Sequence, residues 1–171
     1  MQNKIHLLDQ NLINKIAAGE VIERPASILK ELLENAVDAG AENIDITLEK
    51  SGLEKMSISD NGIGLNSEEV VLAFKQHATS KIRTEKDLDR ILTLGFRGEA
   101  LSSVSSIASV IVHSYNGEDN PVQYFISESE SNNITGSGRN RGTTVTVQNI
   151  FSKMPVRRKF LKSENTEYKY F

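Results

Sequence analysis

Apolar residues recur at helical spacing in five stretches of the chain, and the residues around them mark where helices begin and end. The first stretch follows Asp9, a good N-cap, and Gly19 is expected to close this short helix. The second helix is predicted to begin at Pro25, a favoured first helical position, and to end before Gly40. The third helix begins near Ser67 and carries Val70, Val71 and Phe74. The fourth follows Thr84 and carries Leu88, Ile91 and Leu92. The fifth carries Leu101, Val104 and Ile107.

Alternation of apolar and polar residues predicts strands elsewhere. Residues 44–48 alternate before the Ser51-Gly52 turn and residues 56–58 alternate after it, which is typical of a β-hairpin. Residues 128–142 are rich in Ser, Asn and Gly and are expected to form a flexible loop. Because helices and strands do not alternate regularly, an α+β fold with helices layered on one face of a sheet is favoured over a parallel doubly wound fold. Three further strands are predicted at Ser109–Tyr115, Val122–Ser127 and Thr143–Gln148.

The composition is that of an ordinary folded domain without disulfides. The 171 residues are 38% hydrophobic and 25% charged, which suits one domain, or one domain and the start of another. There is no cysteine, which excludes disulfides, thiolate metal sites and cysteine nucleophiles. No apolar run approaches the ~18 residues of a membrane-spanning helix, and the N-terminus lacks the apolar segment of a signal peptide. We therefore expect a soluble, cytoplasmic protein with no membrane partner.

Charge is distributed unevenly along a chain whose total is nearly balanced. Twenty Lys and Arg stand against 23 Asp and Glu, a formal net charge of −3. Between Arg139 and Lys162 there are seven basic residues and no acidic one, so the remainder carries 13 basic and 23 acidic residues. This asymmetry indicates an anionic partner near the C-terminal end or, equally, a solvated loop and helix face.

The predicted helix from Pro25 places three polar side chains in one stripe. At ~100° per residue, Glu31, Asn35 and Asp38 fall within about 60° of one another. A carboxylate can take a proton from water, and an amide oxygen can bind Mg²⁺ without adding negative charge beside phosphates. By spacing alone, a solvated amphipathic face is the simpler explanation. The stripe borders an apolar half formed by Ile28, Leu29, Leu32, Leu33, Ala36 and Val37.

Asp60 is the second candidate for chemistry. It shares parity with Met56 and Ile58, so its carboxylate faces the same side of the strand as two apolar residues and needs a partner there. The following Asn61-Gly62-Ile63-Gly64 lets backbone approach a ligand closely. The amino group of a purine would satisfy the carboxylate, although this geometry does not choose between adenine and guanine. An Asp-Gly-type turn, in which Asp60 accepts from its own loop amides, explains the pattern equally well.

Two glycine-containing segments are weaker signals. Residues 95–101 (GFRGEAL) form a loop that enters a helix, where free amides and the positive helix end favour an anion, or where a turn precedes a buried helix. Residues 142–144 (GTT) open a strand and carry little information alone. Neither G-x-x-x-x-G-K-[ST] nor G-x-G-x-x-G occurs, which excludes the P-loop and the Rossmann fingerprint. His6, His77 and His113 lack metal-ligand spacing and are interpreted as structural or surface residues.

In their order along the chain, the polar stripe, the Asp60 segment and the two glycine-containing segments together resemble the GHKL ATPases, the family of gyrase, heat-shock chaperones, histidine kinases and MutL. Residues 31–39 (ELLENAVDA) resemble its helical asparagine motif, residues 60–64 (DNGIG) its D-x-G-x-G motif, and residues 142–144 its final threonine motif. Further blocks of the sequence narrow this resemblance to the DNA mismatch repair branch of the family, MutL. The blocks similar to it span nearly the whole chain: residues 16–28 (IAAGEVIERPASI), 77–81 (HATSK), 95–101 (GFRGEAL) and 155–161 (PVRRKFL).

The resemblance implies a two-layer sandwich, with a mixed sheet covered on one face by helices and with ATP and Mg²⁺ bound between the layers. It implies that Glu31 is the general base for the attacking water, that Asn35 is a Mg²⁺ ligand and that Asp60 accepts from the adenine amino group. Gly62 and Gly64 would let backbone approach the nucleotide. A lid over the triphosphate would be formed by Phe96, Arg97, Gly98, Glu99, Ala100 and Leu101, the last four through their amides. Less central contacts would come from Thr79, Ser80, Lys81 and Thr143.

The family also suggests a domain organisation. Residues 1–155 are expected to form the ATP-binding domain, with residues 1–20 as an N-terminal arm, and residues 156–171 to begin a second domain that is absent here. In this family that second domain supplies a lysine to the γ-phosphate, so the fragment is expected to hydrolyse ATP slowly or not at all. We expect the family's C-terminal dimerisation region to be absent as well.

The function implied is an ATP-driven conformational switch of DNA mismatch repair, which couples mismatch recognition to strand processing. Its partners would be a mismatch-recognition protein of the MutS type, DNA bound weakly and without sequence preference, and a second copy in a homodimer. Alternatives are a nucleotide-binding fragment without turnover and another GHKL ATPase such as a gyrase-type subunit. A histidine kinase is disfavoured, because about thirty residues before Glu31 are too few for a helical hairpin and linker. Residues 157–159 (RRK) would contact either DNA or the absent second domain.

Overall fold

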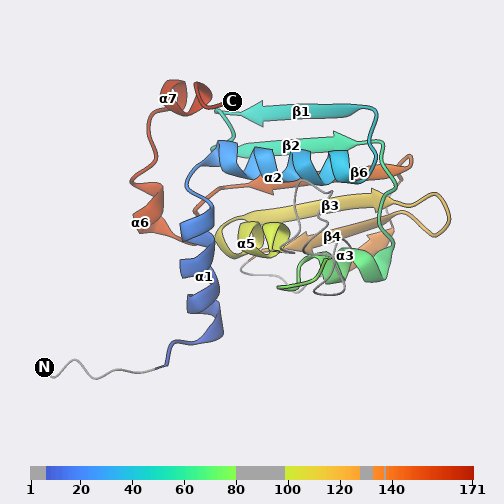
Figure 1. The fold of residues 1–171 in the computed structure, drawn as a ribbon, viewed down its shortest axis with the longest axis horizontal. Coiled ribbons are helices and arrows are strands. Elements are labelled where there is room, and N and C mark those ends of the chain that lie inside the picture. Colours follow the sequence, from blue (N-terminus) through green and yellow to red (C-terminus); the bar gives the residue numbers. More distant parts are fainter. Residues whose placement is uncertain (1–6, 80–98, 128–132, 137) are drawn as a thin grey trace, which may run out of the picture.

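The computed structural model describes residues 7–79, 99–127, 133–136 and 138–171. Six strands form one sheet in the order β1-β2-β6-β3-β4-β5, with helices over one of its faces (Figure 1). The α+β class with a helical layer is confirmed. The strands are β1 (Ile44–Glu49), β2 (Lys55–Asp60), β3 (Ser109–Tyr115), β4 (Val122–Ile126), β5 (Asn133–Gly136) and β6 (Gly142–Gln148).

The expected mixed sheet is wrong, because every pair of neighbouring strands in the described residues is antiparallel. β2 and β3 run in the same direction, but β6 lies between them and runs opposite to both. The expected loop over residues 128–142 is wrong in part, since it contains β5, which extends the sheet beyond β4. The hairpin of β1 and β2 is confirmed, as are the positions of β3, β4 and β6 to within one residue.

The helices are α1 (Gln10–Val21), α2 (Pro25–Asp38), α3 (Ser67–Ala73), α5 (Ala100–Ile107), α6 (Pro155–Arg158) and α7 (Glu164–Tyr168). The helix predicted after Thr84 lies outside the described residues. None of the helices in the described part of the chain is long and apolar enough to cross a membrane.

α1 begins as predicted but ends later. Asp9 caps it, with Oδ1 accepting from the Leu12 N–H at 2.9 Å. The expected end at Gly19 is wrong, because the helix continues to Val21. A glycine can remain inside a helix where packing is close, and a Cβ at Gly19 would lie 3.3 Å from Met154 Cε. The helix stops before Pro25, since the residue preceding a proline, Arg24, takes an extended conformation.

α2 packs over β2 and runs roughly along the strand (Figure 1). Ile28, Leu32 and Ala36 are buried, as the pattern predicts. Val37 was expected in the same apolar half, but it is 52% exposed. It sits in the last turn of α2, where the described residues leave about half of its surface uncovered.

The two faces of the sheet differ in polarity. Met56 and Ile58 of β2 are buried beneath the helices, which confirms the predicted parity of this strand. The opposite face carries hydroxyl pairs between β2 and β6: Ser57 and Thr146 at 3.1 Å, and Thr144 donating to Ser59 at 2.9 Å. We refer to this polar side as the open face.

The segment after β6 returns to the first elements of the chain. α7 lies beside one end of β1 and α2 (Figure 1). The Arg24 guanidinium stacks on the Tyr170 ring at 3.7 Å, and Leu161 packs against the core. Glu167 is buried and accepts from the Lys162 N–H at 3.0 Å. The proposed domain boundary at residue 155 stays a prediction.

Candidate functional site

The ends of β2 and β6 meet at Asp60, the last residue of β2. Its Oδ1 accepts hydrogen bonds from the backbone N–H of Gly62 at 2.9 Å and from that of Thr143 at 3.2 Å. Within the described residues, no hydrogen bond reaches its other oxygen, Oδ2. The loop-amide interpretation of Asp60 is therefore confirmed, yet it uses only one of the two carboxylate oxygens. Oδ2 keeps its capacity to accept from a ligand.

The glycines after Asp60 are held tightly by the protein itself. A Cβ at Gly62 would lie 2.7 Å from the carbonyl oxygen of Ala39, at the end of α2. Gly64 has φ +71°, and a Cβ there would lie 2.0 Å from the carbonyl oxygen of Tyr115, at the end of β3. Both positions therefore require glycine for packing alone. Their approach to a nucleotide stays a prediction.

Ser114 of β3 completes this junction and was not identified from the sequence. Its hydroxyl is fully buried, accepts from the Leu65 N–H at 2.7 Å and lies 2.9 Å from Thr143 Oγ1. Thr143 is thus held at both its backbone and its side chain. The signal was present in the pattern, because Ser114 has the parity of the buried Val110 and Val112, and a hydroxyl there needs partners.

The polar stripe of α2 is present as predicted. Glu31, Asn35 and Asp38 are all partly buried, on a helix that packs against β2. The neighbouring Glu34 is instead engaged by Lys30 of the same helix, with Nζ and Oε1 3.2 Å apart. Glu31 and Glu34 therefore occupy different environments on one helix.

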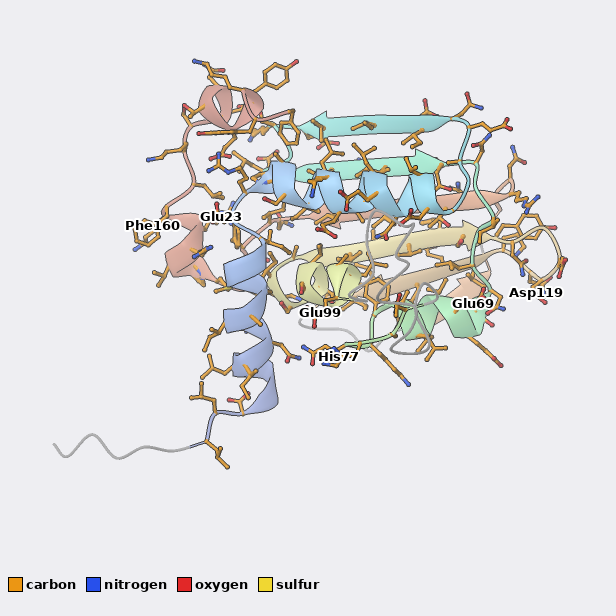
Figure 2. All side chains as sticks on the ribbon, in the orientation of Figure 1. Glu23, Glu69, His77, Glu99, Asp119 and Phe160 are labelled. Atoms are coloured by element: carbon orange, nitrogen blue, oxygen red, sulfur yellow. The ribbon has the colours of Figure 1, made fainter. Side chains whose placement is uncertain are left out.

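The predicted phosphate-binding residues are described only in part. Glu99 is the N-cap residue of α5, and Ala100 and Leu101 form its first turn. The Glu99 carboxylate points toward His77, with Oε1 3.3 Å from Nδ1 (Figure 2). Thr79, two residues beyond His77, is partly buried. Ser80, Lys81, Phe96, Arg97 and Gly98 lie outside the described residues.

Burial shifts the pKa of two basic side chains, Arg139 and His113. Burial lowers the pKa of Arg139, and the charge of Asp60 raises it in opposition. Burial also lowers the pKa of His113, and the charge of Arg139 lowers it further. A histidine whose pKa is lowered in this way is neutral at pH 7.

The chemistry of the donor set bears on whether Mg²⁺ fits here. In the part of the chain that the structure describes, no three His, Asp or Glu side chains form a cluster that could enclose a metal ion. Mg²⁺ bound with a nucleotide needs few protein ligands, because phosphates and waters fill most of its coordination shell. The single carboxamide of Asn35 fits that requirement.

The basic segment does not act as one surface. Arg139 donates to backbone carbonyls at the junction, and Arg157 donates to the Gly19 carbonyl in the last turn of α1. Arg158 and Lys159 are exposed. Only part of the predicted excess of positive charge is therefore directed at solvent.

Comparisons with known proteins agree with this arrangement. Residues 23–151 match the family described as histidine kinase-, DNA gyrase B- and HSP90-like ATPase. The chain is 47% identical over 169 residues to the DNA mismatch repair protein MutL of Caldanaerobacter subterraneus subsp. tengcongensis, covering 98% of the chain and 29% of that relative. It is 48% identical over 167 residues to MutL of Cellvibrio japonicus, covering 96% of the chain and 27% of that relative. The chain thus spans less than a third of the length of these curated relatives.

Solved structures show the same similarity. The N-terminal domain of a DNA repair protein superposes with a TM-score of 0.76 at 34% identity, covering 95% of this chain and 48% of that one. The ATPase domain of Aquifex aeolicus MutL, complexed with ADP, superposes with a TM-score of 0.63 at 28% identity, covering 88% of this chain and 52% of that one.

Proposed function

The chain belongs to the histidine kinase-, DNA gyrase B- and HSP90-like ATPases and resembles MutL along its length, and on this premise we propose that it is the Mg²⁺-dependent ATPase module of a DNA mismatch repair switch. In this proposal, binding and hydrolysis of ATP change the conformation of the larger protein. That change couples mismatch recognition to strand processing.

The observation that carries the proposal is that both hydrogen bonds to the Asp60 carboxylate in the described residues fall on one of its two oxygens, Oδ1. Oδ1 accepts from two backbone amides, which fixes the orientation of the carboxylate. Oδ2 is left to accept one hydrogen bond from a ligand. An adenine amino group is a donor of the right kind, and a hydrogen bond to a charged acceptor contributes about 1.5–3 kcal/mol. Asp60 therefore selects the base, while the glycines beside it keep the loop compact.

Glu31 and Asn35 supply the chemistry in this proposal. Glu31 takes a proton from the water that attacks the γ-phosphate, and as a general base it contributes about 10²–10⁴ in rate. Asn35 holds Mg²⁺, which when bound neutralises charge on the phosphates. The amides of Glu99, Ala100 and Leu101, at the N-terminal end of α5, favour phosphate, because no side chain caps that end in the described residues. Thr79 and Thr143 line the nucleotide less centrally.

The surface of α1 supports dimerisation as the output of the switch. Leu12, Ile13 and Ile16 are each more than 40% exposed, so one face of the arm presents apolar side chains to solvent. A second copy is the occupant we propose, brought into contact when ATP is bound. A mismatch-recognition protein of the MutS type and DNA, bound without sequence preference, are the further partners we propose for the full-length protein.

Single-turnover release of phosphate from ATP tests the proposal. We expect release by the full-length protein in the presence of Mg²⁺, little without Mg²⁺, and slow or no release by residues 1–171 alone. If the full-length protein binds ATP but releases no phosphate, the chain is a nucleotide-binding scaffold, and the hydrolytic proposal is wrong. If ATP does not bind to either protein, the nucleotide proposal as a whole is wrong.

A further inference from the structure

Arg139 lies on the open face of the sheet, and its guanidinium binds the ends of two strands. Nε donates to the carbonyl oxygen of Gly142 at 3.0 Å, and Nη2 donates to the carbonyl oxygen of Asp60 at 2.6 Å. Nη1 donates to the hydroxyl of Thr144, which in turn donates to Ser59 at 2.9 Å. Each of the three nitrogens of the guanidinium is thus committed to β2 or β6.

These contacts begin where the strand pairing stops. The last pair between β2 and β6 is Ser59 with Thr144, so Asp60 and Thr143 lie one residue beyond the ladder. At this point the backbones are very close, because a Cβ at Gly142 would lie 2.1 Å from the Asp60 carbonyl oxygen. The Gly142 carbonyl oxygen also accepts from the Ser114 hydroxyl at 3.2 Å, whereas the fixed fork of Arg139 donates to the carbonyl oxygens of both strands.

The same junction orients the carboxylate that faces the other side of the sheet. The Thr143 N–H that binds Asp60 Oδ1 directly follows Gly142 in the chain, and the Asp60 carbonyl held by Arg139 belongs to the residue that carries the carboxylate. A shift of β6 relative to β2 would lengthen the 3.2 Å bond to Oδ1 and leave the carboxylate oriented by the Gly62 N–H alone.

We propose that Arg139 is a positioning residue for base recognition: by holding the carbonyl oxygens of Asp60 and Gly142 together from the open face, it directs Asp60 Oδ2 toward a purine amino group. This inference rests on the proposed role of Asp60 in nucleotide binding. A guanidinium is always charged in proteins, so its bonds to the carbonyl oxygens are charge-assisted and stronger than neutral ones.

Arg141 provides a matched control. It is two residues away and borders the same polar hollow on the open face, which is also lined by Asn43, Asp45 and Ser59. It is exposed, and in the described residues no hydrogen bond joins it to β2 or β6. Replacing Arg141 removes a positive charge from the same loop but keeps the hydrogen bonds of Arg139 to β2 and β6.

The test compares ATP with inosine triphosphate, which carries a carbonyl oxygen in place of the adenine amino group. Titration calorimetry on the full-length protein measures both dissociation constants for the wild type, Arg139→Ala, Arg139→Lys, Arg141→Ala and Asp60→Asn. We expect the wild type to prefer ATP by about 10–100-fold, as one charge-assisted hydrogen bond implies. Arg139→Ala should reduce this preference about ten-fold and Arg139→Lys should reduce it less, because an ammonium cannot bind the same acceptors together. Arg141→Ala should leave it unchanged.

Each outcome separates the inference from the function on which it rests. Thermal unfolding of the same samples identifies a variant that has lost its fold, and Arg139→Lys then carries the test. If Arg139→Ala and Arg139→Lys weaken both nucleotides equally, the arginine only stabilises the fold, and the inference is overturned. If Asp60→Asn removes the preference while the Arg139 variants keep it, the inference is overturned and the role of Asp60 stands. If Asp60→Asn keeps the preference, the role of Asp60 is wrong, and the inference falls with it.

Discussion

Thr143 donates its backbone N–H to Oδ1 of Asp60 over 3.2 Å, although 83 positions separate the two residues in the sequence. The contact joins the D-x-G-x-G segment to the Gly142-Thr143-Thr144 segment, two motifs that the sequence presents independently. Antiparallel pairing of β2 with β6 brings them together, and Gly142 allows the approach because it has no side chain. The geometry of Asp60 therefore depends on the strand on which Thr143 lies.

Gly142→Ala should destabilise the protein. Gly142 has φ +123°, and a Cβ there would lie 2.1 Å from the Asp60 carbonyl oxygen, so alanine meets both backbone strain and a clash. We expect a loss of more than ~1 kcal/mol in the free energy of unfolding, measured with denaturant. Gly138→Ala is the control, because nothing lies within 4 Å of its added Cβ and its φ is outside the left-handed region. Equal effects of the two substitutions would contradict the packing described.

The stability of the protein should fall as the pH is lowered through the range in which histidine titrates. The pKa of His113 is lowered in the folded state by burial and by Arg139, from an ordinary value of 6.5. Below about pH 6.5 the unfolded chain therefore binds more protons at this residue than the folded one, and the free energy of unfolding decreases. His113→Gln should flatten this decrease between pH 7 and pH 5 in denaturant titrations. An unchanged slope would show that other groups cause it.

Residues 157–159 of the basic segment are predicted to differ in whether they can bind DNA. Arg158 and Lys159 are exposed, whereas Arg157 donates to the Gly19 carbonyl of α1. If the two exposed residues bind DNA phosphates, reversing both charges should flatten the slope of log affinity against log salt by roughly two units, at about 0.9 for each contact. Affinity for ATP should not change. The measurement is a DNA titration at several salt concentrations with the full-length protein.

The competing interpretation of these residues predicts a different result. If Arg158 and Lys159 pack against a second domain through their long apolar stems, the variant should melt at a lower temperature and keep its salt slope. Arg157→Gln is a useful companion variant. It removes the contact with α1, so we expect it to lower thermal stability whether or not the neighbouring residues bind DNA.

Periodicity predicted most of the elements, because burial on one face leaves a regular trace in the sequence. The β1–β2 hairpin, α2 and β3 follow directly from that trace. It could not predict how strands order in the sheet, since β6 enters between β2 and β3 through contacts far apart in the chain. The position of Gly19 inside α1 is a related case: the Met154 side chain, which follows β6 in the sequence, packs closely against this glycine, and no local pattern encodes that contact.

The motifs of the candidate site can be found in the sequence, but not every residue that holds them in place can. Asp60 and Thr143 stand in recognisable segments, whereas the sequence shows Arg139 only as one positive charge in a polar loop. Its role depends on where the β2–β6 ladder stops, and no local pattern encodes that end point. The supporting role of Ser114 can in principle be identified from the sequence, because a serine at a buried strand position needs hydrogen-bond partners.

Binding and hydrolysis should separate at Glu31. We expect Glu31→Ala in the full-length protein to bind ATP normally and to release phosphate about 10²–10⁴ times more slowly, because the attacking water loses its general base. Glu34→Ala is the matched control on the same helix, since Glu34 is paired with Lys30. It should retain wild-type turnover. Wild-type turnover by Glu31→Ala would mean that the polar stripe of α2 is an ordinary solvated face.

The affinity of Asp60→Asn for ATP tests the central claim most directly. Asparagine can keep the acceptor for the Gly62 and Thr143 amides at Oδ1, but it places an amide donor where Oδ2 would accept. Titration calorimetry in Mg²⁺ with the full-length protein should therefore show ATP affinity reduced roughly ten- to hundred-fold, with thermal stability close to that of the wild type. An Asp60→Asn protein that is folded and binds ATP as tightly as the wild type would contradict the account.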